Sequence, residues 1–185
     1  MSGLLALLVI AVLVGVAVGL YNSLVGLRNQ VGGAWAQIDV QLKRRHDLIP
    51  NLVSAVQGYM QHERELFARI TAARARALSA TGAGAVGEAE GALTQAVGGL
   101  IAVMERYPDL KANQNVLALQ EELVTTENRV GFARQLYNDL VARYNTRRES
   151  FPQNLVAGAL GFQPAELFQA DADDRAVPKV DLGAR

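Results

Sequence analysis

The sequence contains no cysteine among its 185 residues. This absence excludes disulfide bonds, a thiolate nucleophile, a cysteine-ligated zinc site and lipoprotein attachment, and it leaves the redox compartment undefined. Aromatic residues are also scarce, at 6% of the chain, although apolar residues make up 50%. The apolar excess consists of Ala, Leu, Val and Gly, which favours long, thin helices over a thick sandwich of sheets.

Net charge is lacking too, because 18 Lys and Arg residues balance 18 Asp and Glu residues. No overall positive field collects nucleic acid, so we expect no nucleic-acid partner. The chain is long enough for an anchor and one domain with a modest core, which argues against a second catalytic domain.

Catalytic and metal-binding motifs are missing from the sequence. His46 and His62 would face nearly opposite sides of a continuous helix, and His62-Glu63 lacks the second histidine of a zincin helix. There is no nucleophile elbow and no phosphate loop. We therefore predict no enzyme, no catalytic residue, no metal and no cofactor. An enzyme using His46, His62 and Glu63 is the alternative, and it would require bound metal.

The N-terminus carries the strongest physical signal. Residues 4–20 are uninterrupted apolar and Gly residues, and no charged side chain precedes Arg28. A helix needs roughly 20 apolar residues to cross the hydrocarbon of a bilayer, which residues 4–27 provide. A cleaved signal peptide would carry a basic n-region, which is absent here. We predict a transmembrane anchor over residues 1–27.

The flanking charges predict the orientation of this anchor. Arg28, Lys43, Arg44 and Arg45 all follow the apolar segment. By the positive-inside rule, the N-terminus lies outside and the C-terminal domain is cytoplasmic. We expect a single-pass protein of the inner (plasma) membrane, whose first partner is the lipid bilayer.

Beyond the anchor, apolar residues recur at alternating steps of three and four. This heptad pattern predicts all-α structure: an elongated, antiparallel bundle of three long helices followed by short C-terminal helices. The expected long helices are residues 31–77, with a kink near Pro50, then 86–107 and 116–144, and the short ones are 154–160 and 164–168. The bundle domain is expected over residues 28–170, with a flexible tail over 171–185.

The membrane-proximal stripe of the first helix, Val31, Trp35, Ile38 and Leu42, has no obvious partner in this scheme. At ~1.5 Å per residue the first helix is roughly 70 Å long and the second roughly 33 Å, so half of the first is left uncovered. An apolar stripe does not stay exposed, which predicts self-association there. The alternatives are that the helix folds back at Pro50 or that the C-terminal segment covers the stripe.

Polar residues interrupt the heptad seams at Arg45, Glu63, Glu90 and Thr126. Polar side chains at seam positions typically fix helix register and partner choice. Acidic residues within 121–129 are placed to meet Arg44 and Arg45. The candidate interaction and register residues are Trp35, Arg45, His46, Asp47, Glu63 and Thr126.

Several blocks of sequence resemble one protein family over nearly the whole chain. They are Tyr21-Asn22, Leu27-Arg28-Asn29, Ala34-Trp35, the run from Gln41 to Val53, Tyr59, His62-Glu63, the run from Tyr107 to Asn113, Leu119-Gln120, Leu123, Thr126-Glu127-Asn128-Arg129, Tyr137-Asn138, Tyr144-Asn145, Phe151-Pro152 and Gly161-Phe162. The family is the LemA family of bacterial membrane proteins. The acidic, proline-containing tail departs from it.

The resemblance implies an N-out, C-in protein with one span and a long-helix bundle. It links relatives to envelope stress alongside a membrane metalloprotease, which makes an envelope protease or another membrane protein a candidate partner, and it places one branch in magnetosome membranes. It assigns no catalytic residue.

Two functions fit these expectations. The first is a membrane-anchored helical scaffold or adaptor that associates with itself and acts in envelope stress or membrane protein quality control. The alternative is a membrane-organising protein that forms arrays, with Phe151, Leu155, Leu160, Phe162 and Phe168 touching lipid. Residues 154–168 contain no Lys or Arg, which weighs against this alternative.

Overall fold

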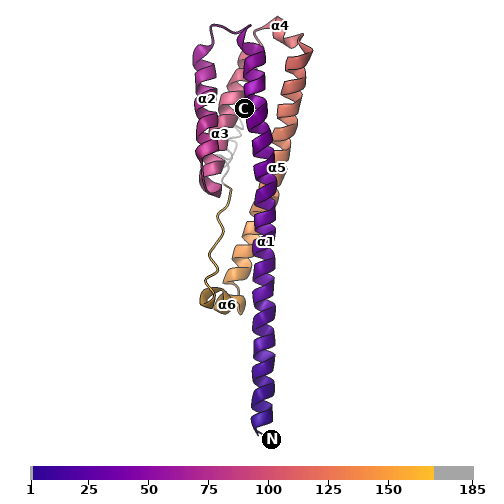
Figure 1. The fold of residues 1–185 in the computed structure, drawn as a ribbon, viewed down its shortest axis with the longest axis vertical. Helices are drawn as coiled ribbons and strands as arrows, with labels where there is room; N and C mark the ends of the chain where they lie inside the picture. Colours follow the sequence, from indigo (N-terminus) through magenta and orange to yellow (C-terminus); the bar gives the residue numbers. More distant parts are fainter. Residues whose placement is uncertain (1, 169–185) are drawn as a thin grey trace, which may run out of the picture. The chain divides into compact units, whose positions relative to one another are not determined.

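The longest helix, α1 (Ser2–Gln57), begins in the apolar N-terminal segment and continues through Pro50. The computed structural model describes residues 2–168 and contains no strand in that range, which confirms the all-α prediction (Figure 1). The other helices are α2 (Arg64–Ser79), α3 (Ala83–Met104), α4 (Pro108–Lys111), α5 (Gln114–Glu149) and α6 (Gln153–Ala159).

The described residues fall into two compact units. Unit 1 combines the chain up to Leu48 with Gln120–Leu167, and unit 2 combines Ile49–Leu119 with Phe168. The helices α1 and α5 each contribute residues to both units.

In unit 1, the first part of α1 has the properties of a membrane span. Its most apolar window has a mean hydropathy of 2.9, and none of that window is buried inside the protein. Leu4, Leu7 and Leu13 are all more than 60% exposed. A helix that exposes leucines on every side is suited to lipid, because water would penalise all of that surface.

The predicted first helix of residues 31–77 is wrong in its extent. The helix ends at Gln57, and a turn precedes α2. Met60 is fully buried in this turn, and its backbone N–H donates to the carbonyl of Val56 at 3.2 Å. Heptad spacing continues across the turn because α2 buries the same kind of stripe, including Ile70 and Ala73. Periodicity alone therefore did not reveal the reversal.

Unit 2 is built around α2 and α3, which pack on each other. Leu66 of α2 lies 3.7 Å from the position that a β-carbon would occupy at Gly99 of α3. The small residue lets the two helices approach closely. Leu93 and Leu100 of α3 are almost fully buried in this core. The predicted helices 86–107 and 116–144 correspond to α3 and α5.

The prediction that the membrane-proximal stripe lacks a partner in its own chain is wrong. Val31, Ile38 and Leu42 are buried within unit 1. Trp35 packs on Tyr137 of α5, with ring centroids 5.4 Å apart. Coverage arises because α5 is 36 residues long, so it extends beside the segment that the shorter α3 was expected to leave bare.

The C-terminal part of unit 1 contains α6, close to the predicted helix of residues 154–160. At its end Gly161 adopts φ +70, and the N–H of Phe162 donates to the carbonyl of Ala157 at 3.0 Å. This is a Schellman motif, in which glycine avoids the steric cost of a left-handed conformation. The predicted helix of residues 164–168 does not form. The predicted tail of residues 171–185 lies outside the described residues.

Candidate functional site

Two ion pairs join α1 to α5 in unit 1. The Nε of Arg44 donates to Oε1 of Glu122 at 3.2 Å on the surface. Arg45 is only 3% exposed in its side chain, and its Nη2 lies 3.1 Å from Oε2 of the half-exposed Glu127. The predicted meeting of these arginines with the acidic residues of 121–129 is confirmed.

Three other predicted site residues of unit 1, His46, Asp47 and Thr126, are close in sequence to the members of these pairs. Thr126 is 1% exposed and its hydroxyl donates to the carbonyl of Glu122 at 2.8 Å. His46 is buried. Asp47 is exposed and pairs with Lys43 one turn earlier, at 3.2 Å. Asp47 is thus a surface residue whose ion pair lies within α1, and such exposed pairs contribute little to stability.

The seam position predicted for Glu63 in the first helix is wrong. Glu63 lies in the turn of unit 2, immediately before α2, where the chain has left α1. Its Oε1 lies 3.5 Å from Nη2 of Arg106, whose side chain is 67% exposed. The structure therefore does not bring Glu63 together with Arg45 in one unit.

An extended segment of residues 162–167, here called the C-terminal strap, is held by side chains of α5. Tyr144 donates its hydroxyl to the carbonyl of Gln163 and Tyr137 donates to that of Glu166, both at 2.8 Å. The amide of Asn145 both donates to the carbonyl of Ala165, at 2.8 Å, and accepts from its N–H, at 2.9 Å. These bonds replace the helical ones that the sequence predicted.

The sequence pattern predicts only that Tyr137 and Tyr144 lie in the helix of residues 116–144, and it indicates no hydrogen bond of Asn145. A signal was available, because a buried phenol almost always finds a hydrogen-bond partner. Burial raises the pKa of Tyr137, and the nearby negative charge of Glu166 raises it further. The phenol therefore stays protonated as the donor to the strap at neutral pH.

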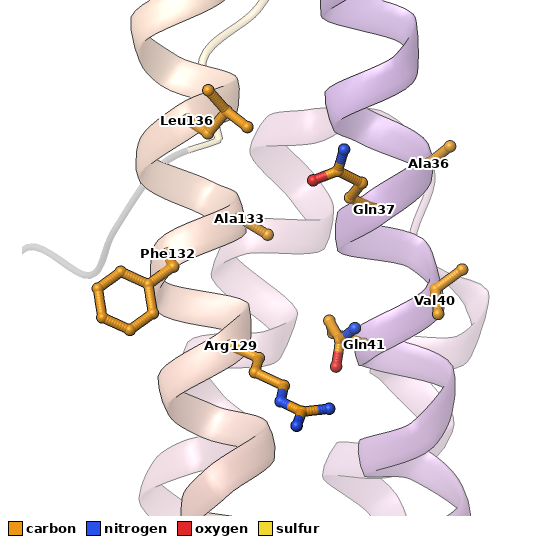
Figure 2. Close-up of a pocket in the computed structure, with 8 residues that line it drawn as sticks. All are labelled: Ala36, Gln37, Val40, Gln41, Arg129, Phe132, Ala133 and Leu136. Carbon is orange, nitrogen blue, oxygen red and sulfur yellow. The ribbon is translucent and has the colours of Figure 1, made fainter.

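Beside the buried stripe, unit 1 has a groove between α1 and α5, here called the α1–α5 groove, with a volume of about 500 Å³. Figure 2 shows Arg129 extending from α5 toward Gln41 of α1, whereas Val40 and Phe132 project outward on the two sides. Val40 is 63% exposed and Phe132 is 73% exposed. The apolar stripe by which α1 faces α5 is already buried. The exposure of these two large apolar side chains is therefore not needed for packing α1 on α5 and marks a surface for a partner.

One polar atom in this groove has no partner among the described residues. The side-chain oxygen Oε1 of Gln41 is buried yet accepts no hydrogen bond. Leaving a buried acceptor unsatisfied costs ~1–3 kcal/mol, so the packing of α1 against α5 carries a polar cost at Gln41.

The described residues contain no group of three or more His, Cys, Asp or Glu side chains arranged to hold a metal ion. The groove combines apolar side chains, two glutamines and one arginine. This lining suits recognition of a protein surface.

Comparisons with known proteins agree with this architecture. The family model described as LemA family matches residues 34–182. The chain belongs to the LemA family. Protein LemA of Metamycoplasma hominis is 28% identical over 171 residues, covering 91% of this chain and 78% of the relative.

Magnetosome protein MamQ 2 of Paramagnetospirillum magneticum is a further relative, 27% identical over 175 residues. Magnetosome protein MamQ of Magnetospirillum gryphiswaldense is 23% identical over 174 residues. Each alignment covers 80% of this chain but only 64% of the magnetosome relative, so this chain spans part of their length. Together with the apolar first part of α1, membership of the LemA family indicates a membrane-associated protein.

Proposed function

We propose that this LemA-family protein is a membrane-anchored helical scaffold that associates with itself through the α1–α5 groove. The observation that carries the proposal is the exposure of Val40 and Phe132, two large apolar side chains that line this groove. Because the predicted stripe at Trp35 is covered by α5, the groove replaces it as the proposed contact.

Position along α1 favours a protein occupant of the groove over lipid. Val40 lies roughly 20 Å beyond Leu27, the end of the predicted anchor, given a rise of ~1.5 Å per residue. That distance exceeds the thickness of a headgroup layer, so the groove lies clear of the bilayer. A second copy suits it because Phe132 provides a projecting side chain next to a recess, which permits a symmetric contact.

The anchor makes weak contacts effective. Confinement to one membrane raises the local concentration of the chain, so lateral association needs no tight affinity in solution. We propose the orientation with the N-terminus outside and the bundle in the cytoplasm, since the basic residues follow the span. A role in envelope stress or membrane protein quality control, with an envelope protease as partner, belongs to the same proposal.

A membrane-organising protein that assembles into larger arrays is the second candidate. The exposed Phe151 and Leu155 near the span favour it, as do relatives named magnetosome proteins. The size of the assembly separates the two functions, because a scaffold gives a discrete oligomer and an array has no fixed size.

The test is the mass of the full-length protein in mild detergent, measured by mass photometry. We expect a discrete oligomer, which Phe132→Ser shifts toward monomer by at least tenfold in dissociation constant, since buried interface aromatics commonly contribute ~2 kcal/mol or more. Leu78→Ser, which changes an exposed leucine of α2, is the matched control and should leave the mass unchanged. A monomeric wild-type protein would contradict self-association.

Cysteine crosslinking extends this test to the membrane, because the sequence has no native cysteine. Phe132→Cys should crosslink between copies with a short bifunctional thiol reagent, and Leu78→Cys should not. Equal crosslinking of both variants would show random collision.

A further inference from the structure

The end of unit 1 next to the span exposes a second apolar surface, here called the α1–α6 groove. It is lined by Val14, Val18 and Tyr21 of α1 and by Leu155 and Leu160 of the segment around α6. Leu155 is 63% exposed and Leu160 is 59% exposed. The groove has a volume of about 670 Å³.

The level of this groove along α1 decides what can occupy it. Val14 lies roughly 9 Å before Leu20, inside the apolar segment suited to hydrocarbon. Side chains that face the same groove as Val14 and Val18 therefore meet acyl chains when α1 spans a bilayer. This argument rests on the membrane anchor and is independent of self-association through Phe132.

The backbone groups at the end of α6 are hydrogen-bonded within the segment, which suits contact with lipid. Its last turn is closed by the Schellman bond from Phe162 to Ala157, and the N–H of Leu160 donates to the carbonyl of Val156 at 3.0 Å. Backbone groups that are satisfied within the segment avoid the penalty of exposure to lipid.

The aromatic side chain at the end of α6 anchors the segment to α1. Phe162 is buried, and its ring lies 5.8 Å from that of Tyr21 in an edge-on arrangement. The guanidinium carbon of Arg28 lies 5.4 Å above the same ring. Phe162 and Phe168 are buried and so do not touch lipid, contrary to the array alternative, whereas Phe151 is 78% exposed.

Basic side chains lie at the adjoining level, on α5. Arg143 and Arg147 line a separate groove with Asn22, Ser23 and Gln30 of α1, just beyond the apolar segment. Both arginines are exposed. Residues 154–168 have no Lys or Arg, so the tertiary structure supplies from α5 the positive charge that this segment lacks.

We propose that α6 and the end of α5 dock on the bilayer surface, with Leu155 and Leu160 among acyl chains and Arg143 and Arg147 bound to anionic phospholipid headgroups. Apolar side chains below the headgroups and guanidinium groups at their level are the two components of interfacial binding. Asn22 and Ser23 add hydrogen-bonding side chains to the headgroup site.

The depth of α6 is tested with full-length protein in vesicles, labelled at a single introduced cysteine with an environment-sensitive fluorophore. We expect lipids carrying a shallow nitroxide to quench Leu155→Cys and Leu160→Cys severalfold more than aqueous iodide does. Val12→Cys in the span is the inserted control, and Leu78→Cys in α2 is the aqueous control. The proposal is overturned if iodide quenches the fluorophore at Leu155→Cys as strongly as the one at Leu78→Cys, while the fluorophore at Val12→Cys stays protected from iodide.

The headgroup site is tested by retention of added phosphatidylglycerol against phosphatidylcholine on the full-length protein, measured by native mass spectrometry. We expect a preference for phosphatidylglycerol that falls roughly fivefold for each arginine lost in Arg143→Gln and Arg147→Gln. Inorganic phosphate should not compete, because it lacks the acyl chains. Competition by phosphate, or no preference between the lipids, overturns the lipid assignment.

Two further variants separate local binding from general effects of charge or folding. Arg69→Gln with Arg76→Gln removes two exposed arginines of α2 and should keep the preference for phosphatidylglycerol. The double variant with Arg143→Lys and Arg147→Lys keeps the charge and should retain most of the preference for phosphatidylglycerol. An equal loss in the α2 variant would mean that net charge, and not this site, selects the lipid.

Discussion

At the residue scale, Arg45 shows how a charge is kept at a buried helix seam. Its guanidinium is almost fully buried, whereas its partner Glu127 is half-exposed. The neighbouring pair of Arg44 and Glu122 joins the same two helices at the surface. The two pairs thus differ mainly in the burial of the arginine, which makes them a matched comparison.

Glu127→Gln should therefore destabilise the protein by about 1 kcal/mol, because it weakens the compensation of a buried charge. Glu122→Gln should cost no more than about 0.5 kcal/mol, since exposed ion pairs contribute little. Chemical unfolding in detergent, followed by circular dichroism, measures both. Equal effects of the two variants would argue against a special role for Arg45 in α1–α5 register.

Tyr137 links stability to pH. Because burial and Glu166 raise its pKa in the folded state, the unfolded chain releases this proton first as pH increases. Its contribution is fully present below the ordinary tyrosine pKa, near 10, and is lost as pH rises through the raised value.

Tyr137→Phe should lose about 1 kcal/mol at pH 8, because the carbonyl of Glu166 loses its donor. The same variant should lose less stability than wild type between pH 8 and 11. Unfolding midpoints across that range provide the measurement. Parallel pH profiles for the two proteins would show that Tyr137 does not titrate with folding.

At the element scale, the turn after α6 depends on one glycine. Gly161 has φ +70, and a β-carbon there would meet nothing within 4 Å, so only backbone conformation opposes a side chain. Gly158, in the interior of α6, also has open space around it and no positive φ.

Gly161→Ala should destabilise the protein by about 1 kcal/mol, whereas Gly158→Ala should stabilise it by up to about 1 kcal/mol. Opposite signs in thermal unfolding would locate the effect in the left-handed turn. If both variants stabilise, the chain reversal that buries Phe162 does not require glycine.

At the scale of the whole molecule, the proposed topology predicts which positions reagents can reach. Ser2→Cys should react with a membrane-impermeant maleimide in intact cells, and Ser79→Cys should react only after permeabilisation, because the basic residues follow the span. Mass-shift labelling reports each position. The reverse pattern would place the bundle outside and would move the proposed headgroup site to the outer leaflet.

The apolar run of residues 4–20 and the heptad stripes determined, by themselves, the candidate span and the helical class. Both depend on local composition and period, which one stretch of sequence contains in full. The meeting of Arg44 and Arg45 with acidic residues of α5 was also predictable, because the acidic residues are concentrated within 121–129 and opposite charges attract.

Only the tertiary structure decided where those helices end and what covers them. The chain reverses after Gln57 although the heptads continue, and α5 buries the stripe around Trp35 that sequence left exposed. Residues 164–167 are extended because Tyr137 and Asn145, more than 15 positions earlier, satisfy backbone groups that a helix would otherwise satisfy. Contacts between distant segments carry no local period, which is why the groove, the strap and the arginines beside the span emerged only in three dimensions.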